Sequence, residues 1–309
     1  MVLKDHKKII PPPWLAYPTI WRGSVLWRMG DGEDYLRQFS DWFAALSPEE
    51  KDEYRTLFPE PTVWKGFWEG RYASELLEHG DFWVEVWQPE GLPKYNLQWL
   101  QQEFAEGRKR ELYLFWKPQP APDGKITESC LSQWWMEDFC FTPASYLCME
   151  QYMMASKAKL FGDEETCKEI MDCNDPKQIK ALGRKVRGFD QTVWDRFKYP
   201  IVLDGNWCKF SQNQDLREFL LSTGDSVLVE ASPYDSIWGI HLSVDAPEAQ
   251  DPMKWHGQNL LGFALMEVRD ELRRVTQNEN LCDWDAVRPK QEPKASRLQA
   301  FLFFFRNRR

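Results

Sequence analysis

Hydrophobic residues recur at helical spacing through most of the chain beyond residue 125, with polar residues at the positions between them. Six segments of this kind predict helices, because apolar side chains three or four residues apart share one helix face. They cover residues 144–160, 163–172, 176–186, 190–203, 213–222 and 259–278. Strand-like runs are short and occur at 112–115, 126–131 and 226–230. The pattern therefore predicts a mainly α fold with minor short strands.

Two helices are predicted before residue 60. The first covers Glu33–Leu46. The second begins after Ser47, because the Ser-Pro-Glu-Glu sequence at 47–50 supplies a cap, a proline for the first turn and the glutamate of a capping box. It is expected to end at Leu57. A third helix is expected around Tyr72–His79.

The clearest boundary in the chain is Pro118–Gly124, a stretch rich in proline and turn residues. We therefore predict a helical, aromatic-rich N-terminal accessory segment over residues 1–118, a catalytic domain over 125–287 and a basic C-terminal tail over 288–309. The accessory segment carries no catalytic constellation, so we expect it to be a layer on the main domain or a partner-binding surface.

Composition narrows the class of protein. No apolar run approaches the roughly 20 residues that span a bilayer, and the polar start has no signal-peptide core, so we expect a cytoplasmic protein without membrane contact. Seven cysteines without a C-x-x-C pair are typical of reduced thiols, and four scattered histidines argue against zinc. We expect catalysis without a metal or a cofactor.

The net charge of −9 disfavours unspecific attraction to nucleic acid. Residues 177–198 differ, because positive side chains outnumber acidic ones there. This segment is either a solvated helix face or a docking surface for phosphates. The chain is also rich in tryptophan, which can fill the core or stack on a base.

The helix predicted over 144–160 carries two charged side chains on the face that should meet the core. Thr142 is suited to cap its start and Gly162 to end it. In a helical projection, Glu150 and Lys157 fall in the middle of the apolar arc, about 10 Å apart along the axis. Both could therefore reach one small ligand. The outer face is expected to carry Gln151, Ser156 and Lys159.

Burying these two charges is costly unless they are paired or serve a function. A structural ion pair, or a Lys157 that reaches the surface, would explain them without any site. The functional alternative is chemical, because burial lowers the pKa of a lysine and raises the pKa of a carboxyl. A nucleophilic amine beside an acid suits the cleavage of a glycosidic bond.

Six motifs in order between Leu131 and Leu272 resemble the NADAR (YbiA-like) family. They read LSQW at 131–134, YLCMEQYMMASK at 146–157, GR at 183–184 with VWDRFK at 193–198, GN at 205–206 with KFSQN at 209–213, EASPYDSIWG at 230–239, and GQNLLGFALM at 257–266. Each motif alone is weak, but the ordered series is specific. In the first motif, Gln133 and Trp134 replace the family's Asn and Phe.

The resemblance implies a compact, mainly helical fold that binds ADP-ribose-like or ribosylated pyrimidine ligands and hydrolyses N-glycosidic bonds. Some members remove ADP-ribose from guanine bases and so reverse a DarT-class toxin, and others cleave ribosylated intermediates of riboflavin synthesis. The family's essential Glu, Trp and Asp correspond to Glu150, Trp194 and Asp235. A lysine that forms a Schiff base with the sugar corresponds to Lys157.

Further positions in the matching motifs are expected to bind substrate. Arg184 and Lys209 either contact a pyrophosphate or are solvated, and the Gly205-Asn206 pair forms either a phosphate-binding loop or an ordinary turn. The full set is Trp134, Tyr146, Met153, Arg184, Asn206, Lys209, Phe210, Gln212, Trp238, Gly239 and Asn259.

Two departures from the family pattern concern the mouth of the expected pocket. His241 stands where a glycine is common in the family. The acidic, proline-bearing stretch Ser243–Trp255 is longer than the family's turn, and it is either a lid or an ordered surface loop.

We therefore predict a hydrolase that removes ADP-ribose from guanine bases in nucleic acid, as an antitoxin would. In this hypothesis Glu150 is the acid and Lys157 traps the anomeric carbon as an imine. Asp235 orients the sugar hydroxyls or activates water, and Trp194 stacks on the base. If Glu150 and Asp235 act as a carboxylate pair, the imine is not needed.

Two alternatives stay open. One is an N-glycosidase that cleaves ribosylaminopyrimidine phosphate intermediates of riboflavin synthesis. The other is a noncatalytic protein that binds ADP-ribose or NAD. The expected partners are ADP-ribosylated nucleic acid or an ADP-ribose-like nucleotide, with a protein of a toxin system as a further candidate.

Overall fold

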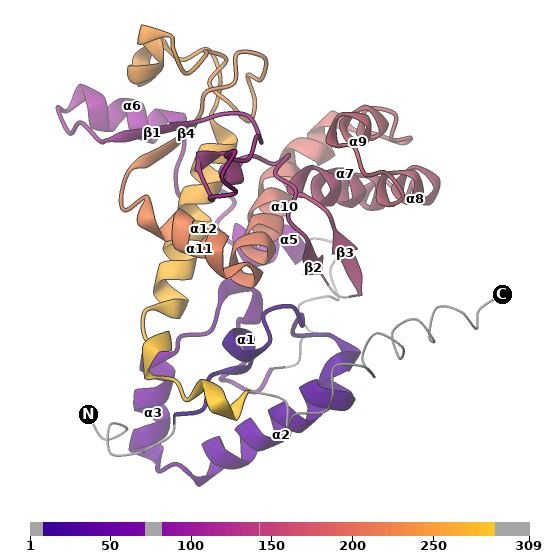
Figure 1. The fold of residues 1–309 in the computed structure, drawn as a ribbon, viewed down its shortest axis with the longest axis vertical. Helices are drawn as coiled ribbons and strands as arrows, with labels where there is room; N and C mark the ends of the chain where they lie inside the picture. The colour runs from indigo at the N-terminus through magenta and orange to yellow at the C-terminus, as the bar shows by residue number, and fades with distance from the viewer. Residues whose placement is uncertain (1–8, 72–81, 142, 288–309) are drawn as a thin grey trace.

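The computed structural model describes residues 9–71, 82–141 and 143–287. Figure 1 shows a chain built mostly from helices, which confirms the predicted mainly α fold with minor short strands. The α-helices are α1 (Pro13–Ala16), α2 (Gly30–Ala45), α3 (Pro48–Leu57), α5 (Phe82–Trp87), α6 (Leu97–Ala105), α7 (Met149–Leu160), α8 (Glu164–Met171), α9 (Pro176–Gly183), α10 (Gln191–Gln212), α11 (Gln214–Ser222) and α12 (Leu260–Thr276). The strands are β1 (Leu112–Phe115), β2 (Phe139–Phe141), β3 (Ala144–Tyr146) and β4 (Val227–Glu230).

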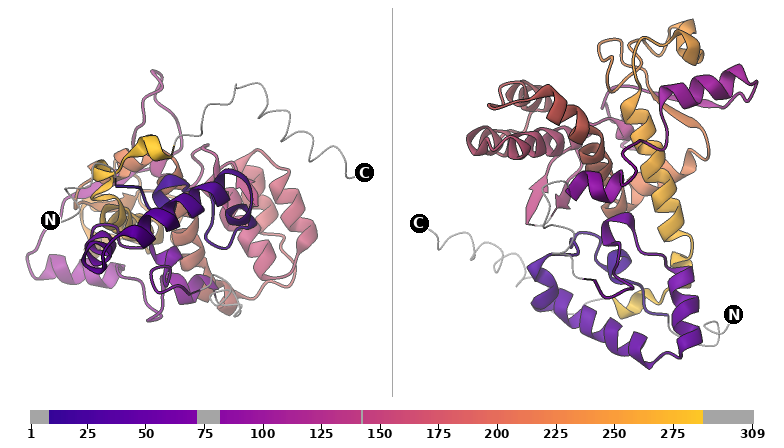
Figure 2. Two further views of the ribbon diagram at one scale, coloured as in Figure 1. Left: turned by 90° about the horizontal axis from the view of Figure 1, so that it is seen from below. Right: turned by 180° about the vertical axis from the view of Figure 1, so that it is seen from behind.

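Two packed regions are joined by the long helix α12. Figure 1 shows α1 to α3 gathered at the lower end of the molecule and a larger region with α7 to α11 above them, and the right-hand view in Figure 2 agrees. The far end of α12 is tied to the segment after α3. The Arg274 side chain donates to the Glu60 carbonyl at 2.8 Å, and the Thr62 N–H donates to Glu271 at 2.6 Å.

Aromatic side chains form the core of the region around α1 to α3. Tyr54 is fully buried and lies 4.7 Å from Phe58 between ring centroids. The predicted start of α3 is confirmed, because the Glu50 N–H donates to Ser47 Oγ while the Ser47 N–H donates to the Glu50 carboxylate.

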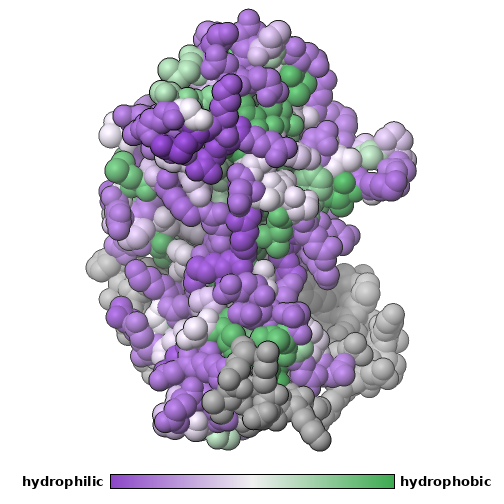
Figure 3. Space-filling view, turned by 90° about the vertical axis from the view of Figure 1, so that its left-hand side faces the viewer, coloured by the Kyte–Doolittle hydropathy of each residue, from purple (hydrophilic) through white to green (hydrophobic). Residues whose placement is uncertain are grey.

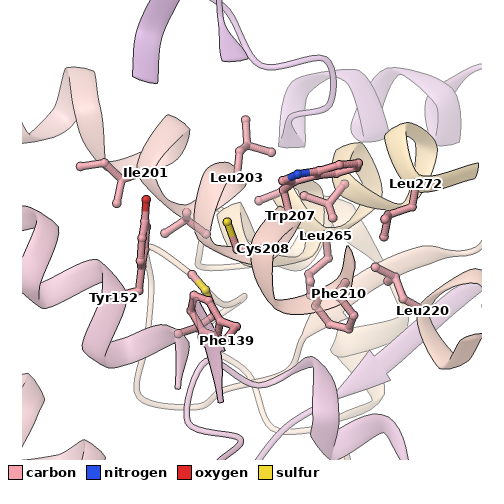
Figure 4. Packing of buried hydrophobic residues seen from close by; sticks show 14 of the residues in the cluster. Phe139, Tyr152, Ile201, Leu203, Trp207, Cys208, Phe210, Leu220, Leu265 and Leu272 are labelled. Atoms are coloured by element: carbon pink, nitrogen blue, oxygen red, sulfur yellow. The ribbon is translucent and has the colours of Figure 1, made fainter. Parts of the chain in front are cut away.

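Helix α10 is the central element of the larger region. It packs against α5, α7 and α12, and Figure 4 shows its buried side chains from Ile201 to Phe210 meeting residues of the surrounding helices. The prediction ended this helix at residue 203 and expected a loop at Gly205-Asn206, which is wrong. A Cβ at Gly205 would lie 2.5 Å from the Tyr152 ring, so this glycine allows α10 and α7 to cross closely.

The strands form two separate pairs. β1 and β4 are parallel, with Phe115 opposite Glu230, and β2 and β3 are antiparallel. Strands were correctly predicted at 112–115 and 226–230, but the strand at 126–131 is wrong. Residues Glu128–Leu131 form a 3-10 helix. The Ser129 carbonyl accepts the Ser132 N–H, and the Cys130 carbonyl accepts the Lys209 side chain.

Helix α7 is shorter and more deeply buried than predicted. It begins at Met149, because residues 144–146 form strand β3 instead, and its N-cap is Cys148. The proposed cap Thr142 lies outside the described residues. Gly162 follows the helix with a left-handed φ of 70°, as predicted.

The outer face predicted for α7 is largely wrong. Gln151 and Ser156 are buried, because α8, α9 and α10 pack around the helix on several sides. The Gln151 amide donates to the carbonyls of Ile170 and Cys173, each at 3.1 Å. Lys159 is exposed, as expected.

Helix α5, which belongs to the first 118 residues, is joined to α7 and α10 by a buried carboxylate. Asp204 of α10 accepts hydrogen bonds from Trp87 of α5 at 3.1 Å and from Tyr152 of α7 at 2.5 Å. The predicted boundaries at 118 and 125 stay a prediction. The helix expected at Tyr72–His79 and the tail over 288–309 lie outside the described residues.

Every helix in the described ranges is too short or too polar to cross a bilayer. The face drawn in Figure 3 is mostly hydrophilic, with separate hydrophobic patches rather than one continuous band.

Candidate active site

A cavity of about 360 Å³ opens beside the carboxyl ends of β1 and β4. Because the two strands are parallel, the residues that follow them lie at the same edge of the pair, where α7 and α9 close the other sides. The cavity is lined by Trp116, Lys117, Pro118, Gln119, Ser132, Gln133, Trp134, Glu150, Lys180, Glu230, Ser232, Tyr234, Asp235 and Trp238.

Glu150 lies in the first turn of α7 and is only 2% exposed. Its N–H donates to the Gln133 carbonyl at 2.9 Å, and Trp134 Nε1 donates to its Oε2 at 3.1 Å. Its Oε1 has no hydrogen-bond partner among the described residues. Burial raises the pKa of Glu150 to about 7, although the positive charge of Lys180 opposes this shift. The group can therefore exchange a proton near neutral pH.

Glu230 is a second cavity carboxyl, at the last position of β4. Burial raises its pKa to about 8, and the negative charge of Asp235 adds to the shift. Its backbone N–H donates to Asn259 Oδ1 at 2.9 Å, while Asn259 Nδ2 donates to the Leu228 carbonyl at the same distance. Asn259, a predicted binding residue, thus fixes the end of the strand from outside the cavity.

Asp235 is held in a tight turn after β4. Its Oδ1 accepts the N–H groups of Ile237 at 2.9 Å and Trp238 at 2.8 Å. Its Oδ2 lies 3.6 Å from Lys180 Nζ on α9. The turn needs glycine at 239, because a Cβ there would lie 2.7 Å from the Glu230 carbonyl oxygen.

Lys209 supports one cavity wall from behind. It is fully buried in α10, and its Nζ donates to the carbonyls of Cys130 at 2.6 Å and Ser132 at 3.1 Å. Burial lowers its pKa to about 8. Its amine is therefore engaged in positioning the loop that carries Gln133 and Trp134. The alternative of a solvated Lys209 is wrong, and the pyrophosphate contact stays a prediction.

A family model described as the NADAR domain matches residues 114–273, which include the whole cavity wall. The chain belongs to the NADAR family.

Parts of the chain are similar in sequence or fold to known proteins. An N-glycosidase of Acanthamoeba polyphaga mimivirus is 52% identical over 128 residues, which are 41% of this chain and 75% of the relative. The chloroplastic riboflavin biosynthesis protein PYRR of Zea mays is 35% identical over 108 residues, 34% of this chain and 16% of that protein. The NMR structure of the E. coli protein YbiA aligns with a TM-score of 0.44 and 24% identity, covering 56% of this chain and 89% of that one.

The structure separates the four predicted catalytic residues of this NADAR chain into two places. Glu150 and Asp235 face the cavity together with the predicted binding residues Trp134 and Trp238. Lys157 lies outside the cavity wall, where its Nζ donates to the Gly183 carbonyl at 2.9 Å.

Trp194 belongs to the same second cluster. Lys157 Nζ lies 5.4 Å from the centroid of the Trp194 ring and 4.2 Å from that of the Phe189 ring. The expected convergence of Lys157 and Glu150 on one ligand is therefore not seen. They occupy opposite ends of α7, and Lys157 reaches the end of α9 instead.

Most other predicted binding residues have structural surroundings. Tyr146, Met153 and Phe210 are core residues, and Asn206 donates to the Val202 carbonyl within α10. Gln212 bonds both the N–H and the carbonyl of Cys140, which holds β2 in place. Arg184 is exposed at the end of α9, and its charge slightly counters the raised pKa of Glu150.

Sequence reasoning missed Glu230, Lys180 and Gln133 as cavity residues. Glu230 opens the EASPYDSIWG motif directly after a predicted strand, which was an available signal. Lys180 lies on the predicted helix just before Gly183-Arg184, but no local pattern shows which way it faces. The residues 116–119 were assigned to the accessory segment and its linker, yet they line the cavity.

The departures from the family pattern have local explanations. His241 has a left-handed φ of 57°, a conformation that glycine adopts at lower cost. The stretch 243–255 contains 3-10 helices at Pro247–Gln250 and Pro252–Lys254, and Gln101 of α6 donates to the Pro252 carbonyl. It lies outside the described cavity wall, as an ordered surface loop.

Proposed function

We propose that this chain is an N-glycosidase that removes ADP-ribose from guanine bases in nucleic acid. One observation carries the proposal: Glu150 is a buried cavity carboxyl with a pKa of about 7 and an oxygen that has no partner among the described residues. Such a carboxyl can deliver a proton to a leaving base near neutral pH. A noncatalytic binding protein would have no need of it.

The reaction breaks the bond between the anomeric carbon of ribose and a base nitrogen. Glu150 protonates the base, which leaves with the bonding electron pair. Asp235 stabilises the positive charge that develops on the sugar and accepts a proton from the attacking water. The water oxygen bonds to the anomeric carbon, and the products are the unmodified guanine, which stays in the nucleic acid, and free ADP-ribose. Lys180 balances the charge of Asp235 at 3.6 Å.

The proposal does not use an imine on Lys157, because that amine is bonded to the Gly183 carbonyl. Lys180 is the amine that lines the cavity beside Glu150. We expect borohydride added during turnover to leave Lys157 unmodified in peptide mass spectra. A reduced sugar adduct on Lys157 would contradict the assignment, and an adduct on Lys180 would replace the acid–base route with an imine route.

Aromatic residues at the cavity wall support a polynucleotide substrate. Tyr234 is 84% exposed, and its ring centroid lies 6.2 Å from that of Trp116. Lys117 Nζ lies 4.5 Å from the Trp116 ring. Exposed rings beside a cation can stack on flanking bases and attract phosphates. A nucleic-acid strand could rest here while the ribosyl group enters the cavity.

A second candidate is the cleavage of a ribosylaminopyrimidine phosphate. The similarity to the maize riboflavin biosynthesis protein favours it. The same acid would serve this reaction. The exposed Tyr234 and the half-buried Trp116, however, would have no role with so small a substrate.

The test is hydrolysis of two substrates by the purified full chain. An oligonucleotide with ADP-ribosylated guanine and the ribosylaminopyrimidine phosphate are incubated separately, and the released ADP-ribose or ribose 5-phosphate is quantified by chromatography. Glu150→Gln is the inactive variant, and Glu169→Gln, an exposed site on α8, is the matched control. We expect release from the oligonucleotide by the wild type and the control.

Release from the pyrimidine phosphate alone would replace the proposed substrate with the second candidate. Release from neither substrate would leave a binding protein as the better explanation. Full activity of Glu150→Gln would exclude Glu150 as the acid.

A further inference from the structure

Three buried acceptor oxygens without partners belong to residues that line the same cavity. They are Gln133 Oε1, Glu150 Oε1 and Glu230 Oε2, and none has a hydrogen-bond partner within the described part of the chain. Buried polar atoms are nearly always satisfied, so each exception calls for an explanation. Gln133 and Glu150 are only 6% and 2% exposed. Their grouping indicates that a ligand supplies the missing donors.

The surrounding contacts hold these three groups in place. Gln133 follows a loop whose carbonyls are held by Lys209, and its own carbonyl accepts the Glu150 N–H. The second Glu150 oxygen is bonded to Trp134. The Glu230 backbone is fixed through its N–H to Asn259 and through its carbonyl to Ile240. The unpartnered oxygens are thus presented by an ordered wall, as a prearranged binding site requires.

The protonation of the two carboxyls indicates which kind of ligand group would bond to these oxygens. Burial raises the pKa of both carboxyls, to about 7 in Glu150 and about 8 in Glu230, so both carry protons for much of the neutral range. A protonated carboxyl donates as well as accepts, and a hydroxyl group can do the same. The negative charge of Asp235 is balanced by Lys180 at 3.6 Å, so a cationic ligand would find little net negative charge here. Neutral hydroxyls on adjacent carbons match these groups best.

We infer that Gln133, Glu150 and Glu230 form a subsite for the two ring hydroxyls of a ribosyl group, with Glu230 as the residue that selects ribose over deoxyribose. The inference rests on the proposed function, because the hydroxyls next to the anomeric carbon must lie beside the acid Glu150. It does not depend on the base, since both candidate substrates carry a ribose 5-phosphoryl group. Glu230 is a positioning residue in this scheme.

The test measures binding, so that it does not require turnover. Ribose 5-phosphate and 2-deoxyribose 5-phosphate are titrated into the full chain and followed by ligand-observed NMR. We expect the wild type to bind ribose 5-phosphate about 10-fold more tightly than 2-deoxyribose 5-phosphate, because the deoxy sugar lacks the hydroxyl that makes one well-placed hydrogen bond. Glu230→Met, which has similar length without polar atoms, should bind the two sugars equally. Glu230→Gln, which keeps a donor and an acceptor, should retain most of the preference.

Thermal unfolding separates this role from a structural one. Because Glu230 Oε2 has no partner in the described structure, Glu230→Met should unfold at the wild-type temperature or above. Equal binding of both sugars by the wild type would overturn the inference, as would an unchanged preference in Glu230→Met. A wild type that prefers ribose 5-phosphate but hydrolyses neither substrate would leave the subsite standing and remove the proposed function.

Discussion

The two ends of α7 carry charged side chains that the protein uses in different ways. At the first turn, Glu150 is almost fully buried, faces a cavity and keeps one oxygen without a partner in the described structure. At the last turn, Lys157 is partly buried, donates to the Gly183 carbonyl and lies against two aromatic rings. Burial lowers the pKa of Lys157 and raises that of Glu150, yet of the two only the glutamate has a buried polar atom without a partner in the described structure.

This difference distinguishes a functional group from a structural one. A cation at the end of a helix is favoured by the helix dipole and by free carbonyls, so Lys157 stabilises the end of α9. Helix α9 also carries Lys180 into the cavity. Lys157 therefore contacts the helix that carries Lys180, whereas Glu150 itself lines the cavity.

The largest expected effect comes from exchanging the acid. Glu150→Gln should lower kcat by about 10²–10⁴-fold, because the amide cannot protonate the leaving base. Its unfolding temperature should be equal to or above that of the wild type, since a buried ionisable group is removed. Steady-state hydrolysis and thermal unfolding measure the two. A large loss of stability together with a small loss of activity would show that Glu150 has a structural role and is not the acid.

Part of the pH dependence of stability should come from Glu150, in addition to that from Glu230. The folded protein binds the Glu150 proton more tightly than the unfolded chain, in which the pKa of this carboxyl is near its ordinary value of 4.5. The stabilisation is thus complete below that pH and is lost as pH rises through about 7. Relative to the wild type, Glu150→Gln should gain about 1–3 kcal/mol between pH 5 and pH 8. Urea unfolding at both pH values measures this, and an equal pH dependence in the two proteins would contradict it.

Removing the amine at the other end should affect stability more than chemistry. Lys157→Met keeps the length of the side chain but loses the bond to the Gly183 carbonyl. We expect the free energy of unfolding to fall by about 1–2 kcal/mol and kcat/KM to change less than about 10-fold. Lys157→Arg, which can still donate, is the matched control. A loss of activity as large as that of Glu150→Gln in a fully stable protein would restore Lys157 as a catalytic residue.

The smallest effect is expected at the aromatic partner. Trp194→Leu removes the ring that lies 5.4 Å from Lys157 Nζ. It should lower the free energy of unfolding by about 0.5–1 kcal/mol in urea and leave kcat nearly unchanged. If Trp194 instead stacks on the base, KM for the oligonucleotide would rise while stability stays the same.

Several features were predictable because they depend on neighbours in the chain. The capping box at Ser47–Glu50 and the glycine after α7 were found from residue type and spacing. Glu150 was recognised because a carboxyl on an apolar helix face is unusual. By contrast, the loop expected at Gly205-Asn206 is part of α10, since glycine there serves a helix crossing that involves Tyr152, far away in the sequence.

The lining of the cavity could not be predicted from local sequence, because it depends on contacts between segments far apart in the chain. Glu230 enters it because β4 pairs with β1, more than a hundred residues earlier, and Lys180 enters it because α9 packs against α7. The direction in which each side chain points follows from these packings and not from its own segment. The partner of Lys157 was not predictable for the same reason, because it is the end of another helix, and the nucleophilic role stays a prediction.

The amino-acid sequence by itself determined the helical class, the family and the presence of a buried acid on α7, since periodicity, caps and ordered motifs are written in local residue order. Only the tertiary structure decided which polar groups have hydrogen-bond partners and which have none in the described part of the chain. Hydrogen-bond partners are chosen by proximity in space, so a lysine and a glutamate seven residues apart can share a helix and still have unrelated roles.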